Sequence, residues 1–172
     1  MSAAAATPDP RSVLDGRLPG AVLDGGQTNG DAWLLVDRSH WLRACQIAKQ
    51  DLGLNQLCFV SAVDHQPGAP RFELICQLRG YRDRQLLRLR CWLDETEPKV
   101  DSLTSVWGNA NWDEREAWEM FGIVFAGHPD LRHLLLPADW IGFPLRRDFP
   151  VGGEVVDFSE DRGLWKSPPP GQ

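Results

Sequence analysis

The sequence contains no long apolar run and none of the common nucleotide-binding or nucleophile motifs. Its apolar stretches are short, as at 123–126 and 134–136, whereas a helix that spans a bilayer needs about 20 apolar residues. We therefore expect no membrane-spanning helix. The patterns GxGxxG, GxxxxGK(S/T) and GxSxG are absent, so nucleotide binding and serine hydrolysis lack the loops that support them.

Basic residues are outnumbered over the 172 positions: 18 Lys and Arg stand against 24 Asp and Glu, for a net charge of −6. General nucleic-acid binders neutralise phosphates with Lys and Arg, so this balance argues against that class of protein. Residues 1–11 lack a basic start followed by an apolar core, which is the pattern of a targeting segment. We expect the chain to stay in the cytosol.

Closely spaced cysteines are also missing, since no CxxC pair occurs among Cys45, Cys58, Cys76 and Cys91. Zinc and iron–sulfur centres usually need several thiolates on one loop. Each cysteine lies in an apolar, periodic segment, so we expect four buried, reduced thiols that pack as small apolar side chains. No redox cofactor is indicated for this chain.

The first half of the chain predicts a strand, a helix and a second strand. Residues 1–30 are rich in Gly, Pro, Asp and Ala, so we expect poor order there. An apolar run at 32–36 predicts a strand, and Ser39 can cap the helix that follows. The longer apolar run at 57–63 is typical of a central strand that is buried on both faces.

Two segments with period-two alternation, 72–78 and 87–93, predict a hairpin around a charged turn at 79–84. Their apolar residues lie on one face. The other face of the second strand carries Arg88 and Arg90, so that side of the sheet is at least partly wet or meets an acidic partner.

Helices are expected at about 102–107 and at 111–121, with Asn111 as N-cap of the second and Gly122 after its end. Strands flanked by helices predict an α+β fold, with a small, mostly antiparallel sheet and helices packed on it. We assign this head domain to residues 31–122.

The pattern changes after the head domain. The stretch 123–150 carries bulky apolar residues between four prolines, namely Pro129, Pro137, Pro144 and Pro150. Because regular elements do not continue through prolines at this spacing, we expect an extended, Pro-rich C-terminal arm that lies on a partner surface. An acidic tail that ends in prolines follows at 151–172.

Tryptophan is abundant, with eight residues. Trp33, Trp92 and Trp118 lie in periodic segments, so we expect them to fill the core. Trp140 and Trp165 lie in non-periodic segments, where an interface role is at least as well supported, because aromatic side chains anchor protein contacts.

One short helix carries a cluster of charged residues: Asp113, Glu114, Arg115, Glu116 and Glu119. A pair of carboxylates could act as acid and base in a hydrolase. A charged helix face, with Arg115 and Glu119 paired at i,i+4, is the favoured interpretation because no second group completes a mechanism.

Two histidines and a basic pair follow this helix. His128 and His133 are five positions apart and do not share a helix face, so turn capping or a partner contact is favoured over a metal site. Arg146 and Arg147, followed by Asp148, are too few charges to hold a membrane surface. We expect them to form ion pairs with an acidic partner.

The segment from 114 to 149 resembles the signature of the thirty-kilodalton subunit of respiratory complex I. Its motifs are ERE (114–116), EMFGI (119–123), GHPDLRHLLLP (127–137), DWIG (139–142) and PLRRDF (144–149). The resemblance extends over about 31–150. Three departures from the family pattern are small: Glu119 replaces Asp, Ala138 replaces Glu, and Arg147 replaces Lys.

The resemblance implies a non-catalytic subunit in the peripheral arm of a proton-translocating NADH:quinone oxidoreductase, at the cytoplasmic face of the cell inner membrane. Such subunits bind no flavin or cluster, and FMN, Fe–S clusters and quinone belong to partner subunits. The partners are the large subunit of the forty-nine-kilodalton type, which lies beside the quinone site, and the Fe–S subunits. The interface is then expected to include Glu114, Arg115, Glu116, His128, Pro129, Asp130, Arg132, Trp140, Arg146, Arg147 and Asp148.

Other functions remain open at this point. Similar subunits occur in the ferredoxin-dependent photosynthetic complex and in membrane-bound hydrogenases, so the electron donor is undetermined. A more distant alternative is a free-standing hydrolase or small binding protein that uses the carboxylate helix.

Overall fold

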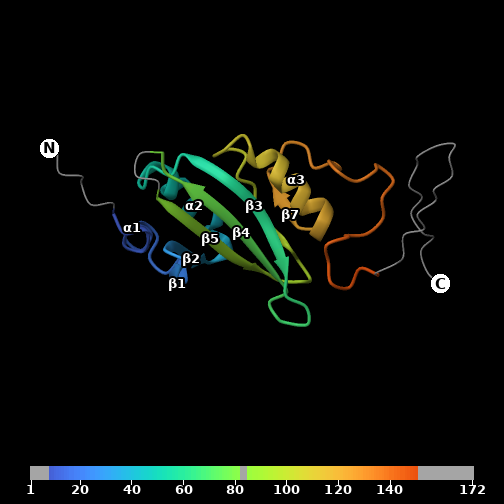
Figure 1. The fold of residues 1–172 in the computed structure, drawn as a ribbon, viewed down its shortest axis with the longest axis horizontal. Coiled ribbons are helices and arrows are strands. Elements are labelled where there is room, and N and C mark those ends of the chain that lie inside the picture. Colours follow the sequence, from blue (N-terminus) through green and yellow to red (C-terminus); the bar gives the residue numbers. More distant parts are fainter. Residues whose placement is uncertain (1–7, 82–84, 151–172) are drawn as a thin grey trace.

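The computed structural model describes residues 8–81 and 85–150, and Figure 1 shows their arrangement. Within these residues the helices and strands are α1 (Pro10–Arg17), β1 (Val22–Thr28), β2 (Asp31–Val36), the 3₁₀ helix η1 (Arg38–His40), α2 (Trp41–Gln50), β3 (Gln56–Asp64), β4 (Phe72–Arg79), β5 (Leu86–Leu93), β6 (Lys99–Asp101), α3 (Ala110–Phe121) and β7 (Val124–Ala126). They form a mixed, mostly antiparallel sheet with helices, which confirms the α+β prediction.

Five strands form the main sheet in the order β1-β2-β5-β4-β3. Neighbouring strands are antiparallel except β2 and β5, which are parallel. The connection from β2 to β5 contains η1, α2, β3 and β4. The predicted hairpin is β4–β5, and the tip of its turn, 82–84, lies outside the described residues. A second, two-stranded parallel sheet pairs β6 with β7.

The N-terminal segment is more regular than its composition suggests. We expected poor order over residues 1–30, and this is wrong for 10–28, which form α1 and β1. The Asp9 carboxylate caps α1 by accepting the Ser12 N–H at 3.0 Å. Asn29 and Gly30 both have positive φ and close the β1–β2 hairpin, as an Asn-Gly turn favours. Residues 1–7 lie outside the described residues.

β3 is an edge strand, so the predicted central strand buried on both faces is wrong. Phe59 and Val63 are each 39% exposed on one face, while Val60 and Ala62 are buried on the other. A bulge between Leu57 and Phe59 shifts the register. The same bulge exposes the Cys58 side chain, which corrects the expectation of four buried thiols; the other three are buried, and all four are free.

α3 covers part of this edge with polar side chains. The Asp113 carboxylate accepts the Val60 N–H at 3.0 Å, and the Asn109 side-chain amide donates to the Leu57 carbonyl at 3.0 Å. These contacts occupy backbone groups of β3 that would otherwise be free to pair with another strand. The edge strand and α3 are therefore one packed unit.

The core lies on one face of the main sheet, against α2 and α3. It joins buried strand residues such as Leu74 and Leu89 to helix residues such as Trp41 and Ala117. In Figure 1, α2 lies behind strands β3, β4 and β5. Trp118 packs on this core, as expected.

Two further tryptophans do not fill the core, which corrects our expectation. Trp33 and Trp92 are half-buried and lie on the opposite face of the sheet, at the positions paired with Arg88 and Glu73. Period-two alternation places them there because their neighbours in the strand, such as Leu34, point into the core.

Local signals predicted the helix ends only in part. The helix expected at 102–107 is a single turn, closed by the Trp107 N–H, which donates to the Leu103 carbonyl at 2.9 Å. α3 begins at Ala110, so Asn111 lies inside it and Asn109 is the N-cap residue. Gly122 ends α3 with a φ of 75°, as predicted.

The cap expected at Ser39 is also displaced. Ser39 lies inside η1, and the Asp37 carboxylate accepts its N–H at 2.9 Å. α2 then starts at Trp41. The Asp37 side chain thus caps η1, and His40, the N-cap residue of α2, makes no capping hydrogen bond with its side chain.

Candidate partner-binding site

The motif residues converge on the segment 127–150, which contains no helix or strand and follows β7. Charged side chains from α3, from the end of β3 and from Arg71, just before β4, hold this segment against the body of the protein. The segment corresponds to most of the predicted arm. Its contact with a partner subunit stays a prediction.

Glu119 binds the first part of the segment. Its carboxylate is 1% exposed and accepts three consecutive backbone N–H groups, from Leu134 at 2.9 Å, Leu135 at 2.9 Å and Leu136 at 3.3 Å. Burial raises the pKa of a carboxyl group, but here the three amides outweigh it and hold the pKa of Glu119 below its usual value. The leucine run is thus fixed to α3 by one carboxylate.

Arg115 binds the carbonyl groups just before that run. Its Nε donates to the Arg132 carbonyl at 3.0 Å, and its Nη2 donates to the His133 carbonyl at 2.8 Å. The expected ion pair between Arg115 and Glu119 is therefore wrong. The Arg115 guanidinium donates to carbonyls of this loop, and the Glu119 carboxylate accepts from amides of the same loop. These charged hydrogen bonds are stronger than an exposed ion pair between residues i and i+4.

Arg146 binds the last part of the segment to the end of α3. Its Nε donates to the Phe121 carbonyl at 2.6 Å. Its guanidinium lies 4.2 Å from the ring centroid of Phe143 and 5.1 Å from that of Phe72. This geometry combines cation–π contacts with a hydrogen bond to a helix C-terminal carbonyl.

An ion cluster around the buried Arg71, between the end of β3 and the start of β4, completes the anchorage. Arg71 is 3% exposed and pairs with Asp64 at 2.9 Å, with Asp148 at 2.8 Å and with Glu95. The Asp64 carboxylate also accepts the Arg147 N–H at 2.9 Å. Burial opposes ionisation of Asp64, but the Arg71 guanidinium and the backbone amides lower its pKa to about 2.

Glu114 is fully buried and takes part in the fold rather than in chemistry. Its carboxylate accepts the Ser102 hydroxyl and the Leu103 N–H, both at 2.6 Å. Burial raises its pKa to about 7. Of the clustered acids, Glu116 alone is exposed, so the helix does not present a carboxylate pair to a substrate.

The remaining predicted residues lie at the surface. The His128 Nδ1 accepts the Asp130 N–H at 3.0 Å, which confirms the turn-capping interpretation. Asp130 and Arg132 form an exposed ion pair at 3.0 Å, and Pro129 is exposed. These residues shape the turn and leave its tip open to solvent.

Sequence reasoning missed the most exposed apolar side chains of the segment. Leu135, Ile141 and Leu145 are 63%, 67% and 54% exposed. Trp140, which we singled out, is half-buried and stacks on Phe149 with ring centroids 6.2 Å apart. The bulky character of this stretch was a signal, but no periodicity told which side chains point outward.

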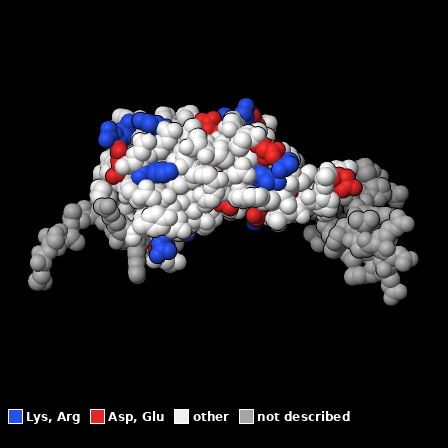
Figure 2. Space-filling view, turned by 90° about the horizontal axis from the view of Figure 1, so that it is seen from above, with Lys and Arg blue, Asp and Glu red and all other residues white. Residues whose placement is uncertain are grey.

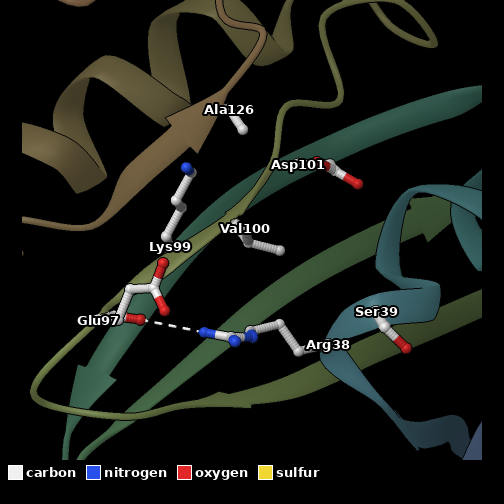
Figure 3. Close-up of a pocket in the computed structure, with 7 residues that line it drawn as sticks. All are labelled: Arg38, Ser39, Glu97, Lys99, Val100, Asp101 and Ala126. Carbon is white, nitrogen blue, oxygen red and sulfur yellow. Dashed lines mark hydrogen bonds between the residues drawn. The ribbon is translucent and has the colours of Figure 1, made fainter.

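A hollow of about 260 Å³ lies elsewhere, between η1 and the β6–β7 sheet (Figure 3). It is lined by Arg38, Ser39, Glu97, Lys99, Val100, Asp101 and Ala126. Cations and carboxylates alternate around it, and the Arg38 guanidinium donates to the Glu97 carbonyl at 3.1 Å. The Ser39 hydroxyl donates to the Asp37 carboxylate and lies 3.1 Å from His40 Nδ1, and none of the predicted site residues belongs to the lining.

The face of the molecule drawn in Figure 2 shows no strongly charged site. Figure 2 shows Lys and Arg next to Asp and Glu in small mixed groups, with neutral surface between them. In the part of the chain that the structure describes, no group of three or more His, Cys, Asp or Glu side chains could hold a metal ion. Over the same residues, no helix is long and apolar enough to cross a bilayer.

Comparison with known proteins agrees with the motif arrangement. The model of the family "Respiratory-chain NADH dehydrogenase, 30 Kd subunit" matches residues 34–155. The NADH-quinone oxidoreductase C subunit of Roseiflexus sp. (strain RS-1) is 39% identical over 153 residues, which cover 87% of this chain and 88% of the relative. A second relative, one of the C subunits of the same enzyme in Rhizobium etli (strain CIAT 652), is 39% identical, with 83% of this chain and 77% of the relative covered.

Solved structures show the same fold. A trypsin-resistant fragment of Nqo5 superposes with a TM-score of 0.59 at 28% identity, over 70% of this chain and 97% of the fragment. A chain of the membrane-bound sulfane sulfur reductase, an archaeal respiratory membrane complex, superposes with a TM-score of 0.64 at 17% identity, over 81% of this chain and 82% of that one. The second likeness concerns the fold alone. This chain belongs to the family of the respiratory-chain NADH dehydrogenase 30 Kd subunit.

Proposed function

We propose that this chain is a non-catalytic subunit in the peripheral arm of a proton-translocating NADH:quinone oxidoreductase. It packs on the large subunit beside the quinone site, next to Fe–S subunits, at the cytoplasmic face of the inner membrane. FMN, Fe–S clusters and quinone are held by the partner subunits. The family match over 34–155 is the observation that carries this proposal.

The anchored segment supports a structural role. Four charged side chains from outside the segment (Asp64, Arg71, Arg115 and Glu119) bind the backbone or side chains of residues 132–148, and Arg146, inside the segment, binds the Phe121 carbonyl. The segment therefore has a fixed shape without a partner, which lowers the entropy cost of binding. It presents Leu135, Ile141 and Leu145 to solvent, and exposed apolar side chains of this size are typical anchors of permanent interfaces.

The electron donor is proposed from the relatives. Those from Roseiflexus and Rhizobium are named as NADH-quinone oxidoreductase subunits, which favours NADH over ferredoxin as the donor of the whole assembly. The likeness to the sulfane sulfur reductase chain carries no argument about the donor. The hydrolase alternative has little support, because Glu114 and Glu119 are buried and bound by protein groups.

The test is purification of the tagged full chain from membranes in mild detergent, followed by mass spectrometry of the proteins that accompany it. We expect the large subunit, the Fe–S subunits and the flavoprotein that oxidises NADH. Recovery of the large subunit without the flavoprotein would contradict the NADH assignment. Recovery of the chain alone from the soluble fraction would overturn the proposal as a whole.

A variant links this result to the segment. Ile141→Asp places a charge at an exposed apolar position, so we expect about tenfold lower recovery of the large subunit, which corresponds to about 1.4 kcal/mol. Leu23→Asp is the matched control, because Leu23 is similarly exposed, at 57%, but lies on β1. Equal recovery with Ile141→Asp and with the control would show that the interface lies elsewhere.

A further inference from the structure

The main sheet has a second face, opposite the core, which we call the open face. Strand register places Phe59 and Val63 of β3, Ile75 and Gln77 of β4, and Arg88 of β5 on this side. Its apolar members are absent both from the buried core cluster and from the partly buried residues that pack against it. In Figure 1, strands β3, β4 and β5 lie in front of α2, so the helix covers the core face only.

The side chains of the open face form an ordered network. The Arg90 guanidinium lies 4.8 Å from the ring centroid of Trp33 and pairs with Glu73. Glu73 also accepts a hydrogen bond from His65 Nε2 at 2.8 Å, and the His65 ring meets the Trp92 ring edge-on at 5.0 Å. The Glu73 carboxylate thus has both of its partners, Arg90 and His65, within the chain.

Arg88 differs from Arg90. Its Nη2 donates to the Gln77 side-chain carbonyl at 3.2 Å, and its Nε is buried with no hydrogen-bond partner among the described residues. The same part of the structure contains no carboxylate paired with Arg88. The guanidinium group has more N–H donors than this one hydrogen bond uses, so Arg88 can bind an acceptor from outside the chain.

The dimensions of the face fit one helix. Strands of a sheet are about 4.8 Å apart, so β3 and β5 are about 10 Å apart across β4, which is the diameter of an α-helix with its side chains. Ile75 and Gln77 lie beneath such a helix, Phe59 flanks it on the β3 side, and Arg88 flanks it on the β5 side.

We propose that the open face binds an amphipathic helix of a neighbouring subunit, with an apolar stripe over Phe59 and Ile75 and a carboxylate bonded to Arg88. A second copy of this chain is a poor occupant, because two open faces would bring guanidinium groups together and offer no free carboxylate. This inference rests on the proposed function only in placing the chain inside an assembly. It concerns a surface separate from the segment 127–150.

The experiment uses the full chain in its assembly, with the photo-crosslinking residue p-benzoylphenylalanine in place of Phe59. This replacement keeps an aromatic ring at a position that is 39% exposed. After irradiation and purification through the tag, mass spectrometry maps the adduct. We expect it on a helix of another subunit, within one turn of an Asp or Glu residue.

Charge reversal tests the role of Arg88. Arg88→Glu should lower the adduct yield about tenfold or more, and Arg88→Gln should lower it less. Reversal of the mapped carboxylate to Lys should restore the yield in the Arg88→Glu background. Arg43→Glu is the matched control, because Arg43 also donates to a glutamine side chain, at 3.0 Å, but lies exposed on α2.

The outcomes separate the two proposals. If the chain is recovered with the large subunit but position 59 forms no adduct to a helix, only the present inference fails. It also fails if the adduct maps to a second copy, to residues 151–172 of the same chain or to a non-helical segment, or if Arg88→Glu changes nothing. If the chain is recovered alone, both proposals fail.

Discussion

Glu114 shows how one residue of the motif can serve the fold and still respond to pH. The side chain is fully buried, and its two hydrogen bonds join α3 to the turn at 102–103. Burial raises its pKa from 4.5 to about 7 in the folded protein. The folded state therefore binds a proton more tightly than the unfolded state, so the stability from this group is complete below about pH 4.5 and is lost as the pH rises through 7.

Glu114→Gln should remove this pH dependence. Glutamine keeps an acceptor for the Leu103 N–H and offers a donor to Ser102, but it does not ionise. Relative to the parent protein, the variant should gain up to about 3 kcal/mol of unfolding free energy between pH 5 and pH 8. Urea unfolding of the purified full chain, followed by tryptophan fluorescence at both pH values, measures this gain. The same change in unfolding free energy between pH 5 and pH 8 in the parent and in the variant would contradict this prediction.

Glu119 acts through backbone amides, so its loss should be felt in the loop that it binds. Glu119→Ala leaves the N–H groups of residues 134–136 without their acceptor, which costs about 2 kcal/mol or more. Hydrogen exchange of these three amides should become about 30-fold faster. Glu116→Ala is the control, because Glu116 is exposed on the same helix. Unchanged exchange at 134–136 in Glu119→Ala would show that the Glu119 carboxylate does not hold these amides.

Elements that are determined by their own sequence pattern were predictable. Features that depend on which strand or helix packs beside an element were not. The β4–β5 hairpin follows from period-two alternation around a charged turn, and α3 follows from its spacing and from Gly122. The turn of the β1–β2 hairpin follows from Asn29-Gly30 as a turn between strands, but the Gly-rich composition before it wrongly suggested poor order for β1. The edge position of β3 depends on which strand pairs with it, and a run that is apolar on both faces carries no such information.

The candidate site shows the same division. The motif strings in 114–149 identified the family, because that identification needs only the order of residue types. They did not reveal that Arg115 and Glu119 bind a loop about 15 residues later in the chain, since contacts of this range leave no periodic trace. The exposed Leu135, Ile141 and Leu145 were missed for the same reason.

The attachment of the segment 143–149 to the end of α3 depends on Arg146. Arg146→Met keeps an unbranched stem between Phe72 and Phe143 but removes the hydrogen bond to the Phe121 carbonyl. Loss of a charged hydrogen bond costs about 1.5–3 kcal/mol, so proteolysis within 143–149 should become at least about tenfold faster, while the rest of the protein stays folded. Arg132→Met, at an exposed position, should not change the rate. Equal cleavage rates in the two variants would show that the other contacts of 143–149 hold it without this hydrogen bond.

At the scale of the whole molecule, the chain carries two surfaces with different construction. The segment 127–150 is an irregular loop that charged side chains fix from within, and it presents apolar residues. The open face is a regular sheet surface on which Arg88 has no acidic partner among the described residues. A molecule with this arrangement can connect two neighbours without moving any part of itself.

If the two surfaces bind independently, their losses should combine as free energies. Ile141 lies in the segment 127–150 and Arg88 lies on the open face. Substitutions at residues that share no partner usually have additive effects on free energy. Each variant should lower incorporation about tenfold in competition with co-expressed, untagged parent chain, so the double variant should lower it about a hundredfold. Quantitative mass spectrometry of the purified complex measures the ratio. A double variant no worse than either single one would mean that both residues act on one contact, since a contact that is already broken cannot be lost again.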